Sequence, residues 1–235
     1  MIRILCVLLI TISLYSCIPE KVRIISDKRI SIEGKVLNTN LPIGGVPVVS
    51  FGVSGTYVNS HPSHILGYGR TSASGEFSFI SLDSRNMKLS ISVNPPYEEL
   101  YNDNFATLHF LYPEGERPAT IRLEEIDLPK KVNFTVRLEN TSGTPEELTY
   151  TLDFRNPEST YLLEQSPENE EEAALNLRNF GSKGGTHNLS DGIKEEVLLT
   201  LEDSEIIFKY ILGEREPQEI SIPVTPQVNA YSFEY

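Results

Sequence analysis

The sequence predicts an all-β protein built from two antiparallel β-sandwich domains. Apolar residues recur at every second position in short runs, which is the pattern of strands with one face on a core and one in water. Gly, Pro, Asn and Ser cluster between these runs, as turns require. The chain of 235 residues is long enough for two domains of about 100 residues each. These observations predict a tandem of two sandwiches.

The first 16 residues have the layout of a secretory signal peptide. Arg3 precedes an apolar run from Ile4 to Ile12, and small or polar residues follow this run. A membrane-spanning helix needs about 20 apolar residues, so this run is too short to cross a bilayer. We therefore expect residues 1–16 to direct export and to be removed.

The end of this segment carries a second signal. Residues 14–17 read LYSC and follow the apolar run directly, with Tyr15 where a small residue is usual. This arrangement resembles the lipobox of bacterial lipoproteins. The resemblance implies that Cys17 becomes the first residue of the mature chain and carries palmitate-type acyl chains, which hold a soluble body on a membrane. The alternative is an ordinary secreted protein in which this Cys occurs by chance.

Cysteine count and charge restrict the remaining possibilities. Cys6 would leave with the signal peptide and Cys17 would carry lipid, so no disulfide is expected. Loss of Arg3 leaves 19 basic against 33 acidic residues, a formal net charge of −14. Such a surface repels nucleic acid and anionic lipid headgroups. Attachment to the membrane should therefore depend on the acyl chains alone.

We expect residues 17–28 to form a tether and residues 29–127 to form the first sandwich. The tether segment alternates poorly and offers no apolar face. The residues predicted to point into the first core are Ile30, Ile32, Val46, Val48, Phe77, Phe79, Leu89, Ile91, Val93, Leu108, Phe110, Ile121 and Leu123.

Two motifs in this domain resemble a known family. Residues 34–36 and 41–48 read GKV and LPIGGVPV, and residues 69–79 read GRTSASGEFSF, with Ser72 where Asp is usual. Together they are similar to the carboxypeptidase regulatory-like domain. The resemblance implies a transthyretin-like sandwich of about seven strands that is not catalytic. Gly75 should adopt the positive φ of a hairpin turn.

Residues 128–235 should form the second sandwich, which is immunoglobulin-like or transthyretin-like. Alternation predicts one hairpin from residues 132–138 and 148–154, and another from residues 197–201 and 206–212. Pro223 lacks an N–H, which favours an edge position for its strand. Five Glu residues between positions 164 and 172 predict a solvated acidic loop.

The search for chemistry gives no catalytic residue. His61 and His64 are placed in a loop, where they would supply at most two of the three or four ligands that zinc requires. The loop at residues 102–104 contains Asp103 but too few oxygens for calcium. His109 should face outward from a strand. We expect no metal, no cofactor and no enzymatic activity, although an enzyme dependent on His61, His64 or Asp103 is a distant alternative.

These observations favour a lipid-anchored envelope protein that serves as an accessory binding or assembly module. Tyrosines in or near first-domain loops are candidate sugar-stacking residues, namely Tyr57, Tyr68, Tyr97, Tyr101 and Tyr112. The partner is left open between a protein and a glycan, and the alternative role is a fimbrial-type subunit or anchor. Residues 18–21 contain no dense acidic cluster. We therefore expect a periplasm-facing position on the outer membrane, with the cell surface as the alternative.

Overall fold

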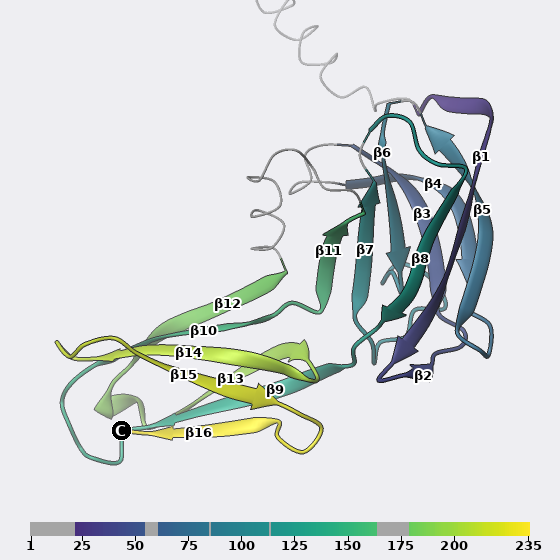
Figure 1. Cartoon of the computed structure of the whole chain (residues 1–235). Coiled ribbons are helices and arrows are strands. Elements are labelled where there is room, and N and C mark those ends of the chain that lie inside the picture. Colours follow the sequence, from purple (N-terminus) through teal and green to yellow (C-terminus); the bar gives the residue numbers. More distant parts are fainter. Residues whose placement is uncertain (1–21, 55–60, 85, 113, 164–178) are drawn as a thin grey trace, which may run out of the picture.

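A computed structural model describes residues 22–54, 61–84, 86–112, 114–163 and 179–235, with the side chains of residues 27 and 61–63 left out. The predicted signal peptide, Cys17 and the acidic segment 164–172 lie outside the described residues. Strands and their turns make up the described chain, apart from a single 3-10 turn at Leu189–Asp191. The predicted all-β fold with two sandwiches is confirmed (Figure 1).

The first sandwich packs two sheets face to face. One sheet has the order β2-β1-β5, with β8 on the other side of β1, and the second has the order β11-β7-β6-β3-β4. The strands are β1 (Ile24–Asn38), β2 (Leu41–Pro42), β3 (Pro47–Ser54), β4 (His61–Arg70), β5 (Glu76–Ser84), β6 (Lys88–Val93), β7 (Thr107–Tyr112), β8 (Thr120–Asp127) and β11 (Glu158–Leu162).

Alternation predicted the core of this sandwich correctly. Every residue expected to point inward lies in the main apolar cluster; Phe110 is only partly buried there. Gly75 has a φ of 79°, as predicted for the turn between β4 and β5. The tether is shorter than expected, because β1 begins at Ile24 and Val22 already packs against the core.

The first sandwich contains a strand, β11, that was not predicted to belong to it. It lies well beyond residue 127 in sequence, yet it pairs in parallel with β7 at the edge of the first domain's sheet. The chain thus passes from the second sandwich into the first and then returns to β12 (Figure 1). Glu158 pairs with Thr107 and Leu162 with Leu111 in this ladder. The two sandwiches are therefore joined by a shared sheet as well as by the linker at residues 128–130.

The second sandwich consists of a four-stranded sheet, β12-β10-β14-β15, and a three-stranded sheet, β13-β9-β16. Its core contains Phe134, Tyr150 and Phe208, all almost fully buried. The strands are β9 (Lys131–Glu139), β10 (Leu148–Arg155), β12 (Phe180–His187), β13 (Ile193–Leu201), β14 (Ser204–Leu212), β15 (Gln218–Val224) and β16 (Ala230–Glu234).

Strand pairing in this sandwich corrects two predictions. β9 pairs with β13 and β16 instead of β10, and β14 pairs with β10 and β15 instead of β13. In each predicted hairpin, the two strands instead lie in different sheets of the sandwich. Three pairs are parallel, β1 with β8, β7 with β11 and β9 with β16, so the sheets are mixed. The edge position predicted for Pro223 is confirmed, because within the described part of the chain β15 pairs with β14 and with no other strand.

Candidate functional site

The polar residues singled out from the sequence do not meet at one place. His64 is exposed on β4, so the pair His61 and His64 lies in a strand and not in the predicted loop. Asp103 binds Lys131 at 2.7 Å. This hydrogen bond, followed by the charge of Lys131, lowers the pKa of Asp103. No group of three or more His, Cys, Asp and Glu side chains among the described residues is placed to hold a metal ion.

The first-domain tyrosines also serve separate structural roles. Tyr112 is buried in the core, and Tyr101 accepts a hydrogen bond from Lys131 at 2.7 Å. Tyr97 packs edge-on against Phe51 with ring centroids 5.4 Å apart, and burial raises its pKa to about 12. Tyr68 is exposed on β4, while Tyr57 lies outside the described residues. The tyrosines with described positions therefore do not form a common stacking platform.

One hydrogen-bonded chain has the residue types of a hydrolytic triad. Ser92 Oγ lies 2.7 Å from His109 Nδ1, and His109 Nε2 lies 3.0 Å from Glu158 Oε1. These residues come from β6, β7 and β11, which are neighbours in one sheet. Only 1% of Ser92 is exposed. Ser92 is thus shielded from solvent, and the chain of contacts links β6, β7 and β11 across the sheet.

A hollow with a defined lining lies on the outer face of the four-stranded sheet. We call it the sheet-face groove; its volume is about 720 Å³. It is lined by Asp153 and Arg155 of β10, Phe180, Gly181 and Ser182 of β12, and Asp203, Ser204, Glu205 and Ile207 of β14 and its preceding turn. Its size falls within the range of about 300–1,000 Å³ that is typical of ligand sites.

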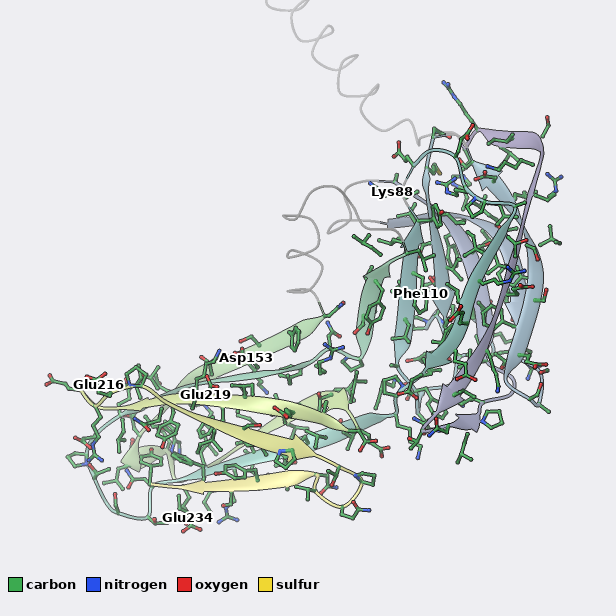
Figure 2. The ribbon with its side chains drawn as sticks, in the orientation of Figure 1. Lys88, Phe110, Asp153, Glu216, Glu219 and Glu234 are labelled. Carbon is green, nitrogen blue, oxygen red and sulfur yellow. The ribbon has the colours of Figure 1, made fainter. Side chains whose placement is uncertain are left out.

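The position of the groove follows from the strand registers. Asp153 pairs with Ser182 on one side and Ile207 on the other, so the three side chains share one face of the sheet. Leu152 points to the opposite face and is fully buried. The groove therefore occupies the outward side of strands whose inward side forms the core. Asp153 is labelled in Figure 2, on the side of the sandwich nearer the first domain.

Charge and aromatic surface are combined in this groove. Arg155 stacks over the ring of Phe180 at 4.9 Å, and 49% of Phe180 remains exposed. Burial acts to raise the pKa of Asp153, but hydrogen bonds from Lys209 at 2.8 Å and Ser182 at 2.7 Å outweigh it and lower the pKa. Asp153 is thus ionised at neutral pH, and the positive charge of Lys209 compensates its negative charge.

A smaller pocket of about 240 Å³ adjoins the groove at the junction of the two sandwiches. It shares Arg155, Asp203 and Ser204 with the groove. Asn38, Asp127 and Tyr161 line it from the first sandwich. The groove and this junction pocket thus lie next to each other, and together they form a depression whose lining includes residues of both domains.

Sequence reasoning missed this depression because its lining depends on which strands are neighbours. Phe180 and Ile207 lie on strands that are both next to β10, although 27 residues separate them. The exposed aromatic residue at the start of a glycine-rich strand was the only local signal. The predicted anchor residue, Cys17, lies outside the described residues. Within the described residues, no helix has the length and apolar character needed to cross a membrane.

No protein-family pattern and no curated protein matches this sequence. Among solved structures, the Bacillus anthracis TIE protein is similar over 88% of this chain and 34% of its own, with 10% identity and a TM-score of 0.31. A 9R-lipoxygenase from Cyanothece is similar over 52% of this chain and 20% of its own, with 15% identity and a TM-score of 0.28. GBS52, the minor pilin of Streptococcus agalactiae, is similar over 87% of this chain and 94% of its own, with 11% identity and a TM-score of 0.29. This chain thus spans about a third of the first protein and a fifth of the second, and likenesses at this level carry no argument about function.

Proposed function

We propose that this chain is a lipid-anchored bacterial envelope protein that binds a partner through the sheet-face groove, as an accessory module and not as an enzyme. The observation that carries the proposal is the groove itself. It offers an apolar floor, with acidic residues at its border, on a face that the protein's own core does not use. An exposed hollow of this kind is the default binding site of a domain.

A lipid on Cys17 would hold the body of the protein close to the membrane. Val22 is five residues beyond Cys17, and a fully extended chain of this length spans at most about 17 Å. The backbone N–H of Arg23 donates to Asn86 Oδ1 at 3.0 Å, so the chain is fixed to the first sandwich directly after this short link. The first sandwich would therefore stand beside the bilayer, and the second would extend beyond it.

Charge favours a particular kind of partner for the groove. Asp153 is neutralised by Lys209, and Arg155 lies on Phe180, whereas Asp203 is exposed at the border. Glu205 is also exposed and accepts a hydrogen bond from Ser221 at 2.9 Å. A peptide with one apolar and one basic side chain would fill the floor and meet the carboxylates. The proposed partner is accordingly a protein segment of this chemistry.

Anchoring is tested by membrane partitioning and intact mass in a bacterial host. The wild-type chain should partition with membranes and have the mass of an acylated chain beginning at Cys17. Cys17→Ala should release it, whereas Cys6→Ala should leave it attached, because Cys6 is removed with the signal peptide. An unacylated wild-type chain in the soluble fraction would refute the anchored function.

The groove is tested by photo-crosslinking in intact cells. A photoreactive residue in place of Phe180 should form a discrete adduct, and the same residue in place of Ile80 should not. Ile80 is the matched control, because it is 59% exposed on the first sandwich. Adding Ile207→Asp should abolish the Phe180 adduct by placing a charge on the groove floor. Equal labelling at both positions, or none at position 180, would exclude the groove as the binding site.

One observation favours assembly as a second candidate function. The outer face of β13 exposes Ile193, Val197 and Leu199 on a strand that, among the described strands, pairs only with β9. Long apolar edge strands are ready templates for pairing with another chain. If the protein is a structural subunit, light scattering should detect oligomers that Val197→Lys converts to monomers. A wild-type protein that stays monomeric at high concentration would exclude this role.

A further inference from the structure

A second hollow opens at the far end of the second sandwich. We call it the distal cleft, and its volume is about 510 Å³. It lies where the edge strands β15 and β16 leave the two sheets open to one side. Figure 2 labels Glu216 and Glu234, two of its lining residues, toward the end of this sandwich that is remote from the first domain.

Aromatic rings line the inner part of this cleft. Tyr210 and Phe233 have ring centroids 4.7 Å apart, and the rings of Phe233 and Tyr235 stack at 5.9 Å. Tyr210 and Tyr235 are each only partly buried. The cleft therefore presents aromatic surface to the outside, although the same rings also close the core.

Polar groups with both donor and acceptor capacity surround these rings. Gln218 contributes an amide that donates one hydrogen bond to Glu216 O at 3.4 Å. Ser142 and Thr144 contribute hydroxyls that already take part in hydrogen bonds within their own loop. Within the part of the chain that the structure describes, the Tyr210 hydroxyl and the Glu216 carboxylate make no hydrogen bond. These groups are consequently available to a ligand.

Contacts within the chain hold both walls of the cleft. Asn140 holds the loop that forms one wall, because its side chain donates to Thr144 O at 2.8 Å and accepts from the Gly143 N–H at 2.9 Å. On the opposite wall, Arg215 pairs with Glu146 at 2.7 Å, which compensates its positive charge. The remaining charges at the mouth, on Glu216 and Glu234, are both negative.

We infer that the distal cleft binds a neutral oligosaccharide. Sugar rings present apolar C–H faces to aromatic rings, and their hydroxyls both donate and accept hydrogen bonds. This matches the mixture of rings, amide, hydroxyls and carboxylates in the cleft. The negative mouth disfavours acidic sugars, and a simple cation would leave the amide and hydroxyl groups unused. This inference concerns a site separate from the sheet-face groove and goes beyond the proposed function.

The test is binding of neutral and acidic oligosaccharides to the purified mature protein, in a detergent that has no sugar headgroup. Saturation-transfer NMR should detect neutral hexose trisaccharides, but not oligogalacturonate. Glu216→Gln should weaken binding about fivefold, and Tyr210→Phe by a similar factor, since each removes one hydrogen bond while keeping the shape of the cleft. Glu219→Gln is the matched control and should change affinity less than about twofold. Glu219 pairs with Lys209 on the outer face of the same sheet, outside the cleft, and is labelled in Figure 2.

Absence of binding to every neutral trisaccharide would overturn the inference, as would equal effects of Glu216→Gln and Glu219→Gln. If a tetramethylammonium probe binds and none of the sugars does, the cleft is a cation site, and this result would also overturn the inference. Crosslinking at Phe180 reports on the other groove, so a failure here is distinguishable from a failure of the proposed function.

Discussion

Glu158 Oε1 lies 3.0 Å from His109 Nε2, which joins two strands that are 49 residues apart in sequence. Tyr161, three residues beyond Glu158, stacks on Phe110, the residue that follows His109, with ring centroids 5.7 Å apart. Both contacts connect β11 to β7 and supplement the parallel ladder between them. The far edge of β11 is held by Asn179, whose side chain accepts from the Thr160 N–H at 2.7 Å and donates to Thr160 O at 3.0 Å.

We predict that Asn179→Ala loosens β11. The change leaves two buried backbone groups of Thr160 without partners, which costs about 2 kcal/mol of unfolding free energy. Hydrogen exchange should accelerate at residues 158–162 more than in the core strands. Asn133→Ala, on the exposed face of β9, is the control and should alter neither quantity. Unchanged exchange in β11 would contradict the role given to Asn179.

The ion pair between Asp83 and Arg117 should contribute strongly to stability. Both side chains are almost fully buried, with Asp83 Oδ1 2.5 Å from Arg117 Nη1. Asp83→Asn removes the buried negative charge that both Arg117 and Lys28 contact, and should cost about 3–5 kcal/mol in urea unfolding. Glu33→Gln removes the same kind of group from the exposed pair with Arg122, and should cost less than about 1 kcal/mol. Equal losses for the two variants would refute the contrast.

Glu196 should make stability depend on acid pH. Burial acts to raise its pKa, but hydrogen bonds from Lys183 and Tyr150 outweigh it, and the pKa falls below its usual 4.5. The stability from Glu196 is therefore complete above pH 4.5 and is lost as the pH falls through the lowered value. Urea midpoints of the wild type and Glu196→Gln should differ at pH 7 and converge as the pH falls below 4.5. A difference that stays constant over this range would contradict the prediction.

Two glycines with positive φ should differ in their tolerance of a side chain. Gly75 has a φ of 79°, and an added Cβ would lie 2.4 Å from Val36 O. Gly115 has a φ of 123°, and an added Cβ would meet nothing within 4 Å. Gly115→Ala should cost about 1 kcal/mol, from backbone strain alone. Gly75→Ala should cost clearly more, and thermal unfolding of the two variants measures the difference.

Alternation identified the core because each residue's side of a strand follows from local sequence. Phe134, Val136 and Leu138 are buried as predicted. The partner of a strand does not follow from alternation, because any strand with an apolar face satisfies the same pattern. The run at residues 148–154 was therefore assigned to β9, although it lies in the opposite sheet.

The candidate sites were harder to predict for the same reason. The contact between Ser92 and His109 exists because these residues are opposite each other in the register of β6 and β7. Nothing within either strand indicates that register. Tyr210 and Phe233, which line the distal cleft, appear in the sequence only as two more inward-facing aromatic residues. Their place in the lining of the cleft depends on the open side between β15 and β16.

The insertion of β11 has a mechanical consequence. The chain crosses between the sandwiches at the linker after β8, again from β10 to β11, and again on its return to β12. If the protein is held at its N-terminus and pulled from the second sandwich, the load does not fall on one linker. It is shared with the β7–β11 ladder, which must shear or peel before the domains separate. Under tension the two domains should therefore stay together as one unit and not separate before either of them unfolds.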